Sequence, residues 1–410
     1  MPVRFDTLLP RAVALCAGVI LTLGASASAQ LPLRDLAARR GLIRFGTCAD
    51  IGRLRAGADD GKYPAYIARE YSLVEPENDL KPPAVWRGDG IYNWANADYL
   101  LGAPGETGWA QKNHVAVRGH VLVYARDDGY TLPDWLRKSE ADISPARARQ
   151  LLHDYIFAVA GRYRGKLVAW DVVNEAIDDG PNDRPFHLRD SFWFRKLGPD
   201  FLKLAFQWAH EADPRAELYY NEYGAEGMGR KSNDVFALLQ WLKSAGVFVT
   251  GAGMQYHLSV GDHVAAGDDH YLNARRLASA GFSFMVTELD VQMPVSDPKT
   301  GYVPLVAADL DRQAEVYRSV LDFALTSGNC RGLQMWGPSD NHSWIPAASA
   351  GKGAATPANA EYQPKPAYRA LQEEASRIPR ARAAARKPTS DDKAEISLSG
   401  SATPSRVPTY

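Results

Sequence analysis

Cysteine is scarce in this sequence, with three residues among 410. Cys16 lies in the apolar N-terminal segment, so Cys48 and Cys330 could form at most one disulfide bond in an oxidising compartment. Cys48 ends one strand-like run, whereas Cys330 precedes the start of another. If the strands are parallel, these positions lie at opposite ends of the sheet. We therefore expect two free thiols, and a fold held together by a disulfide framework is excluded.

An excess of charge of either sign is also missing. The chain has 47 Lys and Arg residues against 48 Asp and Glu residues. This balance gives no electrostatic reason to expect nucleic acid or an anionic membrane as a partner. Nearly half of the residues are apolar, at 46%, which is ample for a large core.

The main apolar run of the N-terminus is too short for a comfortable membrane span. Basic residues precede this run, VALCAGVILTLGA, and the small residues ASA follow it before Gln30. This layout predicts a secretory signal peptide over residues 1–29. We favour cleavage before Gln30 and export, to the periplasm or outside the cell, over a retained membrane anchor.

Eight strand-like runs recur along the chain, each followed by a helix-like stretch or a long loop. Apolar residues of the intervening segments, such as SPARARQLLHDYIFAVAGRY, recur at three- and four-residue spacing. This alternation predicts an α/β fold, a single (β/α)8 TIM barrel with parallel strands, over residues 30–375. The strand-like runs are residues 43–49, 71–78, 114–124, 166–175, 216–223, 248–257, 282–291 and 332–337.

The composition changes near residue 376. Residues 376–410 are rich in Arg, Pro, Ser and Ala and poor in aromatic residues. Such a segment cannot bury a core and is predicted to be a disordered tail. Its basic half could contact an acidic wall polymer, although a solvated tail is the simpler interpretation.

Polar residues and one tryptophan stand at the ends of seven of the eight runs. In a TIM barrel the C-terminal strand ends and their loops build the active site. A single residue of this kind would be interpreted as a structural group with satisfied hydrogen bonds, but seven strand ends on one face indicate a functional site. These residues are Glu77 and Asn78, His120, Asn174 and Glu175, Asn221 and Glu222, Gln255 and His257, Glu288 and Asp290, and Trp336.

Glu175 and Glu288 end the fourth and seventh strand-like runs. Two carboxyl groups facing one another across a barrel mouth suit glycoside hydrolysis, in which one protonates the leaving group while the other attacks or activates water. His257 could lie between Glu288 and Asp290 and keep Glu288 ionised as a nucleophile. Asn174 is placed to donate to a sugar hydroxyl.

The structural alternative, in which both glutamates form ion pairs, lacks obvious partners. Lys81 and Arg118 are the basic residues at the matching strand ends. Aromatic residues add to the functional interpretation, because sugars stack their apolar C–H faces on rings. A lone tryptophan is more often part of a core, so only Trp336 and Trp344, in MWGPSDNHSWIP, are taken as functional.

The motifs around these residues resemble glycoside hydrolase family 10, the retaining endo-β-1,4-xylanases. WDVVNE (170–175) resembles the acid/base motif of that family and TELDV (287–291) its nucleophile motif. The matches keep the order of the family and cover roughly residues 40–375. The further matches are PENDLK (76–81), RGH (118–120), LYYNEY (218–223), GMQYHL (253–258), WGPSDNHSW (336–344) and KPAY (365–368).

The resemblance implies that Glu175 is the general acid/base and Glu288 the nucleophile, with His257 and Asp290 orienting and charging that nucleophile. It also implies a carboxyl separation of roughly 5–5.5 Å, as in retaining enzymes. No metal or organic cofactor is implied, because the protein supplies both acid and nucleophile. The substrate-binding residues it implies are Glu77, Asn78, Lys81, His120, Asn174, Tyr223, Gln255, Trp336 and Trp344.

The sequence departs from the family after the third strand. Members usually have GHTLVWH there, and this chain has GHVLVYA, with Tyr124 at the Trp position and Ala125 at the His position. The following loop, residues 126–136, is longer than usual, and GAPGETGW (102–109) interrupts the preceding helix. Losing a hydrogen bond to a sugar hydroxyl can change selectivity by orders of magnitude. Arg126, Asp127 or Asp128 could replace it.

The leading prediction is a secreted, monomeric, retaining glycosidase that binds the polysaccharide xylan and cuts its internal β-1,4 bonds. We expect it to bind neither nucleic acid nor, after signal cleavage, a membrane. One alternative is the same mechanism retuned to a decorated xylan or another β-glycan. A weakly catalytic carbohydrate-binding protein is disfavoured by the intact Glu175 and Glu288. An aldolase or isomerase is disfavoured because no phosphate-type glycine loop and no strand-end Schiff-base lysine is present.

Overall fold

The computed structural model describes residues 31–40 and 44–377. The predicted signal peptide, residues 1–29, lies outside the described residues, and so does most of the predicted tail. Helix α15 (Pro366–Arg377) extends two residues into that tail. Among the described residues, no helix combines the length and apolarity that a membrane span requires.

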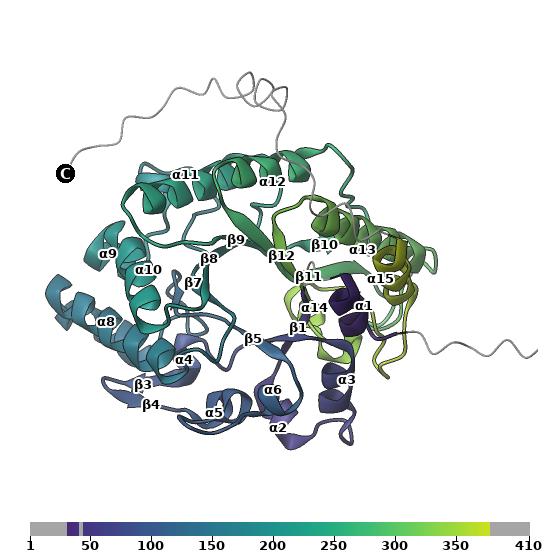
Figure 1. Ribbon diagram of the computed structural model, residues 1–410, viewed down its shortest axis with the longest axis horizontal. Helices are drawn as coiled ribbons and strands as arrows, with labels where there is room; N and C mark the ends of the chain where they lie inside the picture. Colours follow the sequence, from purple (N-terminus) through teal and green to yellow (C-terminus); the bar gives the residue numbers. More distant parts are fainter. Residues whose placement is uncertain (1–30, 41–43, 378–410) are drawn as a thin grey trace, which may run out of the picture. The chain divides into compact units, whose positions relative to one another are not determined.

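A closed barrel of eight parallel strands forms the centre of the molecule (Figure 1), which confirms the predicted fold class. The first strand pairs with the last through the register Arg44↔Gly332, and this pairing closes the barrel. Six of the strands lie within their predicted runs, one continues three residues past the end of its run, and one starts two residues before its run. They are β1 (Arg44–Ala49), β2 (Leu73–Pro76), β5 (Ala116–Gly119), β7 (Ala169–Asn174), β8 (Glu217–Glu222), β9 (Gly251–Met254), β11 (Ser283–Pro294) and β12 (Cys330–Met335).

Five short strands lie outside the barrel proper. Three of them pair beside barrel strands, β6 with β7 in parallel, β10 with β11 in parallel, and β13 with the end of β11 in antiparallel orientation. The other two form a separate hairpin. The bounds are β3 (Trp86–Gly88), β4 (Ile91–Tyr92), β6 (Val123–Tyr124), β10 (His257–Ser259) and β13 (Lys352–Gly353).

Helices surround the barrel and cover the outer face of its strands (Figure 1). Helix α8 shows how the local sequence sets the start of a helix. Ser144 caps its first turn by accepting a hydrogen bond from the Arg147 amide, and Pro145 is its first residue. Its buried face follows three- and four-residue spacing. The helices besides α15 are α1 (Leu33–Arg40), α2 (Ile51–Ala56), α3 (Lys62–Glu70), α4 (Pro82–Val85), α5 (Ala95–Leu101), α6 (Trp109–Lys112), α7 (Asp134–Lys138), α8 (Pro145–Arg162), α9 (Phe192–Leu197), α10 (Asp200–Ala212), α11 (Arg230–Ser244), α12 (Asp269–Ser279), α13 (Asp309–Thr326) and α14 (Ile345–Ala348).

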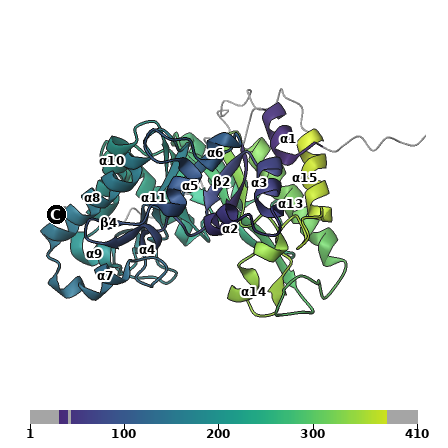
Figure 2. The same cartoon turned by 90° about the horizontal axis from the view of Figure 1, so that it is seen from below.

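The first and last described helices, α1 and α15, lie side by side (Figures 1 and 2). Glu70, at the end of α3, joins them through one carboxylate oxygen. Its Oε2 accepts from the Leu33 amide at 3.2 Å and from the Tyr368 hydroxyl at 2.6 Å. A buried carboxylate with several donors is satisfied, so this contact fixes both ends of the described chain to the same point.

Both cysteines of the barrel are buried free thiols, as predicted. Cys48 lies near the carboxyl end of β1 and Cys330 at the amino end of the neighbouring β12. Burial raises the pKa of Cys330 to about 12 and that of Cys48 well above its usual value. At neutral pH neither thiol is a reactive thiolate.

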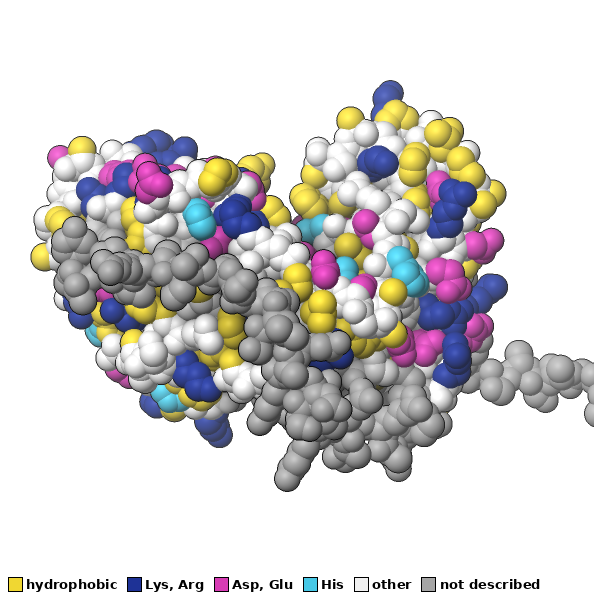
Figure 3. Space-filling model, turned by 90° about the horizontal axis from the view of Figure 1, so that it is seen from above, with side chains coloured by type: hydrophobic (Ala, Val, Ile, Leu, Met, Phe, Trp, Pro, Cys, Tyr) yellow, Lys and Arg dark blue, Asp and Glu magenta, His cyan; other side chains and the backbone are white. Residues whose placement is uncertain are grey.

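The carboxyl ends of the strands open into a deep notch. Figure 2 shows α4, α7 and α9 on one side of this face and α14 on the other. The space-filling view shows the surface hollowed between the two corresponding lobes (Figure 3). We call this notch the cleft, and the residues expected from the sequence to be functional follow the strands that end at its floor.

Candidate active site

A fully buried cluster of charges lies inside the barrel beneath the cleft. Arg118 on β5 donates from Nη1 to Glu75 Oε2 at 2.6 Å and from Nη2 to Asp171 on β7. His120 contacts the other oxygen of Asp171 at 2.9 Å from Nδ1. Glu75, His120 and Asp171 have the spacing of a metal-ligand set. The guanidinium of Arg118 already bridges the two carboxylates, so it supplies the positive charge of this cluster.

The predicted contact between Glu288, His257 and Asp290 is confirmed. Nε2 of His257 lies 3.3 Å from Glu288 Oε2, and its Nδ1 lies 3.0 Å from Asp290 Oδ2. The pairing of β10 with β11 brings this about, because it sets His257 directly opposite Asp290. The histidine therefore links the two carboxylates of the same strand, as their alternation on β11 predicts.

Burial and positive charge act in opposite directions on Glu288. Burial alone would raise its pKa, but the hydrogen bonds from His257 and Asn221 and the positive charges of His120 and His257 lower it to about 2. Burial would likewise lower the pKa of His257, and the charges of Asp290 and Glu288 raise it well above its usual value. At neutral pH Glu288 is thus a carboxylate beside an imidazolium.

Two tryptophans of the last loop pack beside His257. Trp344 donates from Nε1 to Asp290 Oδ2 at 2.8 Å, and its ring lies 5.0 Å from the His257 ring. Trp336 is buried with its ring edge-on to both His120 and His257. Trp344 is 38% exposed, so part of its surface remains accessible.

A chain of amide side chains connects Glu288 to Glu175. Asn221 on β8 donates from Nδ2 to Glu288 Oε1 at 2.8 Å and to Asn174 Oδ1 at 2.9 Å. Asn174 in turn donates to Glu175 Oε1 at 3.3 Å, and Gln255 donates to the same oxygen at 3.0 Å. The bridging role of Asn221 was not predicted, although its position at the end of a buried strand was a signal for it.

Glu175 follows β7 with a φ of 53°, in the left-handed region that residues other than glycine seldom adopt. A conformation of this kind costs roughly 1–3 kcal/mol and is concentrated at functional sites. The Glu175 amide donates to the Asn221 carbonyl at 3.0 Å, which holds the turn in place.

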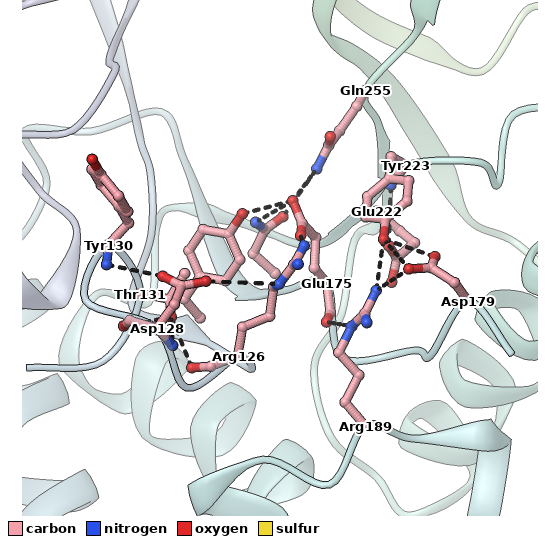
Figure 4. A network of polar contacts seen from close by, with 12 residues as sticks. Arg126, Asp128, Tyr130, Thr131, Glu175, Asp179, Arg189, Glu222, Tyr223 and Gln255 are labelled. Atoms are coloured by element: carbon pink, nitrogen blue, oxygen red, sulfur yellow. Dashed lines mark hydrogen bonds and ion pairs between the residues drawn. The ribbon is translucent and has the colours of Figure 1, made fainter. Parts of the chain in front are cut away.

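The carboxylate of Glu175 has a cationic partner, which the sequence interpretation did not anticipate. Arg126 Nη1 lies 3.0 Å from Glu175 Oε2 (Figure 4). The Tyr124 hydroxyl donates to Oε1 of the same carboxylate at 2.7 Å. The expectation that the glutamates lack an arginine or lysine partner is therefore wrong for Glu175. The cation comes from the loop after β6 rather than from a strand end. Burial and the negative charge of Glu175 raise the pKa of Tyr124 well above its usual value, so its hydroxyl remains a donor.

The two aspartates that follow Arg126 have other roles. Asp127 accepts from the Phe192 amide at 2.9 Å and from Arg195 at 2.7 Å, so it fastens the loop to α9. Asp128 accepts from the Tyr130 amide at 2.9 Å within the loop (Figure 4). Of the three residues considered as replacements for the missing histidine, Arg126 is the one in contact with Glu175.

The same loop forms one wall of a second hollow on the rim. The hollow has a volume of about 480 Å³, and Tyr130 at its edge is 81% exposed. Trp86 and Trp135 meet edge to face in its wall, with ring centroids 5.0 Å apart. The lining residues are Pro83, Trp86, Arg87, Gly129, Tyr130, Pro133, Asp134 and Trp135.

Tyr223 lies near Glu175, within a cluster of charged residues (Figure 4). Its hydroxyl contacts Asp179 and accepts from Arg189 at 2.7 Å, and Arg189 also donates to the Glu175 carbonyl at 3.0 Å. The preceding residue, Glu222, forms an ion pair with Lys231 at 3.0 Å. Burial outweighs that pairing and raises the pKa of Glu222 to about 7.

Glu77, Asn78 and Lys81 follow β2 in the loop that leads to α4. Lys81 donates from Nζ to Asn78 Oδ1 at 2.9 Å, and the same Nζ lies 5.8 Å above the Tyr124 ring. Burial raises the pKa of Glu77. The contact with Tyr124 joins this group to the surroundings of Glu175, so polar residues that are nearly a hundred positions apart in the sequence share one cleft.

Comparison with known proteins agrees with this geometry. The model of glycosyl hydrolase family 10 matches residues 32–374. Endo-1,4-beta-xylanase B of Thermotoga neapolitana is 32% identical over 367 residues, which are 89% of this chain and 96% of that protein. Endo-1,4-beta-xylanase 3 of Hypocrea jecorina is 33% identical over 344 residues, 82% of this chain and 84% of its own length.

Solved structures give the same assignment. Native xylanase 10B from Thermotoga maritima has a TM-score of 0.75 and 31% identity, and the match covers 84% of this chain and 98% of that one. Xylanase 10B from Thermotoga petrophila, solved in complex with xylobiose, has a TM-score of 0.75 with 31% identity over 84% and 97% of the two chains. With the (β/α)8 barrel and a family match over most of its length, the chain belongs to glycosyl hydrolase family 10, the endo-1,4-β-xylanase family.

Proposed function

We propose that the protein is a retaining, endo-acting β-1,4-xylanase that cuts internal bonds of xylan through a covalent glycosyl-enzyme. The observation that carries the proposal is the asymmetry of the two cleft glutamates. The hydrogen bond and charge of His257 keep Glu288 a carboxylate with a pKa of about 2. Glu175, by contrast, is connected to Glu288 through the hydrogen bonds of Asn174 and Asn221. A retaining mechanism needs such a pair, one group that attacks and one that transfers a proton.

In the proposed first step a Glu288 oxygen attacks the anomeric carbon while Glu175 gives its proton to the departing sugar oxygen. In the second step water attacks the same carbon and gives a proton to Glu175, and the bond to Glu288 breaks. Asp290 positions His257, and the donor from Asn221 holds the second oxygen of Glu288. The amide of Asn174 is the candidate donor to a hydroxyl of the attacked sugar.

The sugars are proposed to bind along the cleft on both sides of the two glutamates. Trp336 and Trp344 offer ring surfaces beside His257. The remaining groups are polar and suit the hydroxyl groups of a xylan chain; they are Glu77, Asn78, Lys81, His120, Gln255 and Tyr223.

We further propose that the chain is exported, with the segment before Gln30 as its signal peptide, and that it acts in the periplasm or outside the cell. The pattern of basic, apolar and small residues at the N-terminus supports this proposal. Export would bring the enzyme to a polymer that is too large to enter a cell.

A second candidate function keeps the mechanism and changes the polymer. Tyr124 and Arg126 contact Glu175, and Ala125 takes the place of the usual histidine. A charged guanidinium beside the acid/base favours a substrate with an acidic decoration over plain xylan. This observation supports a decorated xylan, or another β-glycan, as the alternative substrate.

The proposed function is tested by incubating the mature protein with glucuronoxylan and with arabinoxylan, beside a Glu288→Ala control. We expect xylo-oligosaccharides from the wild type alone, and an early fall in viscosity that marks internal cleavage. Release from glucuronoxylan only would favour the acidic decoration. No release from either polymer by the folded protein would contradict xylanase activity and lead to a screen of other β-glycans.

His257→Asn is expected to move the acid limb of the pH profile of kcat/KM to higher pH by about one unit or more. The positive charge of His257 helps to lower the pKa of Glu288, so its removal raises that pKa. Activity that needs the ionised nucleophile is then lost at a higher pH as the pH falls. The profile is measured with an aryl β-xylobioside.

The matched control for this variant is His153→Asn. His153 also pairs with an aspartate, Asp154 at 3.0 Å, but on the outer surface of α8. The acid limb of the pH profile of His153→Asn should coincide with that of the wild type. An unmoved acid limb in His257→Asn would show that the histidine positions Glu288 without charging it.

A further inference from the structure

The ion pair between Arg126 and Glu175 opposes part of the proposed reaction. Arg126 Nη1 lies 3.0 Å from Glu175 Oε2, and the arginine side chain is 41% exposed. A neighbouring guanidinium favours the ionised form of a carboxyl group. The first step of the proposed mechanism requires Glu175 to carry a proton, whereas the second step requires it to accept one.

Other ionisable groups around Glu175 do not supply this cation. Tyr124 donates a neutral hydroxyl, and Arg189 contacts the backbone carbonyl of Glu175 and is paired with Asp179 at 3.2 Å. Lys231 is paired with Glu222 and Asp179. The titratable and charged groups that face Glu175 from the surrounding elements are Tyr124, Arg126, Arg189, Glu222, Tyr223, Lys231 and Glu288.

The structure offers Arg126 a second place. A hollow of about 210 Å³ lies beside it, with Ala125, Asp127, Arg189 and Ser191 in its wall. The carboxylates of Asp178 and Asp190 also line it, and they lie 3.6 Å from Arg189 and 3.9 Å from Arg195, respectively. Nε of Arg126 is already 4.0 Å from Asp128 Oδ2. The small side chain of Ala125, where the family usually has histidine, leaves this space open beside the guanidinium.

We propose that Arg126 is a positioning residue that governs the charge of Glu175 between the two steps of the reaction. Paired with Glu175, it favours the carboxylate that removes a proton from water in the second step. Turned toward the hollow, it leaves Glu175 free to hold the proton that passes to the leaving oxygen in the first step. This inference rests on the proposed retaining mechanism.

The test uses two aryl β-xylobiosides that differ in their need for an acid. Phenyl β-xylobioside requires protonation of its leaving oxygen, whereas 2,4-dinitrophenyl β-xylobioside leaves without it. In Arg126→Ala the alkaline limb of kcat/KM for the phenyl substrate should move up by about one pH unit, at the low end of the effect of a neighbouring charge. The dinitrophenyl substrate should show no such movement, and Arg126→Lys should restore the wild-type limb.

The control is Arg137→Ala, on α7 near the same loop. Arg137 has the same 41% exposure and pairs with Asp134, but it contacts neither glutamate of the cleft. Its profiles should coincide with those of the wild type. The urea midpoints of all variants are measured alongside, and Arg126→Gln repeats the experiment if the alanine variant does not fold.

Three results would overturn the inference. These are an unmoved alkaline limb in both Arg126→Ala and Arg126→Gln, an equal movement with both substrates, and a pH-independent loss of activity, which would mark Arg126 as merely structural. Failure of the proposed function looks different, since wild type would then cleave neither xyloside at any pH, and the inference would fall with it.

Discussion

Glu288→Ala is expected to lower kcat for xylan by roughly 10⁵-fold or more, a loss of the size seen when a nucleophile is removed from other hydrolases. Glu288 is buried between His257 and Asn221, and both donors remain in the variant. The space left by the side chain suits a small anion. Sodium azide should therefore restore cleavage of 2,4-dinitrophenyl β-xylobioside and give the α-glycosyl azide, because a single displacement inverts the anomeric carbon.

Glu175→Ala is the contrasting variant in this experiment. The glycosyl-enzyme still forms on Glu288 when the leaving group is good, so azide can attack it from the face that water normally uses. Two displacements then retain the configuration and yield the β-glycosyl azide. Identifying the anomer by NMR distinguishes the two roles, and the opposite pair of products would reverse the assignment of nucleophile and acid/base.

Glu217→Ala serves as the matched control for both glutamate variants. Glu217 also belongs to a barrel strand, but it lies at the amino end of β8, away from the cleft. The Glu217→Ala variant should hydrolyse xylan at nearly the wild-type rate and form no glycosyl azide. A loss in Glu217→Ala equal to that in Glu288→Ala would mean that the assay reports folding rather than chemistry.

Arg118→Met is expected to lower the free energy of unfolding by about 3–5 kcal/mol, the cost of leaving buried charges without their partner. Arg118, Glu75 and Asp171 have side chains that are 0% exposed. Burial raises the pKa of Glu75 well above its usual value even with Arg118 in place. Urea unfolding followed by tryptophan fluorescence measures the change.

The pH dependence of this loss has a definite sign. Without Arg118 the pKa of Glu75 in the folded protein rises further above that of the unfolded chain. A raised carboxyl pKa contributes stability at low pH that is lost as the pH rises. The penalty of Arg118→Met should therefore be larger at pH 8 than at pH 5.

Two further variants separate charge from packing. Arg137→Met removes an exposed, paired arginine and should change stability by less than about 1 kcal/mol. The triple variant Glu75→Gln/Arg118→Met/Asp171→Asn should recover part of the loss, because replacing a whole buried cluster costs less than removing one partner. If the triple variant is less stable than Arg118→Met, the loss comes from packing and not from an uncompensated charge.

The barrel could be predicted from sequence because its pattern is long and repeated. Eight apolar runs separated by segments of helical period leave few architectures other than eight parallel strands. The short strands β3, β4 and β13 were not predicted, since two or three residues hold no readable period. Their pairing is set by neighbours that lie far away in the sequence or across a turn.

The candidate site likewise contains contacts that the sequence could predict and contacts that it could not. The positions of Glu288, Asp290 and His257 follow from strand alternation and strand order, so their contact was predictable. The contact of Arg126 with Glu175 was not, because that loop is held by Asp127 on the Phe192 amide, 65 residues further on. Loop geometry of this kind depends on tertiary contacts that have no local sequence signal.

The order in which the chain is synthesised gives the barrel closure a further meaning. Strand β1 can pair with β12 only after β12 has been synthesised. The hydrogen bond from the Tyr368 hydroxyl to Glu70 can form only later still. A chain emerging from the ribosome therefore keeps an open, unpaired sheet edge until nearly all of it exists. Such an edge invites pairing with other chains, and the pairing of β1 with β12 removes it only near the end of synthesis.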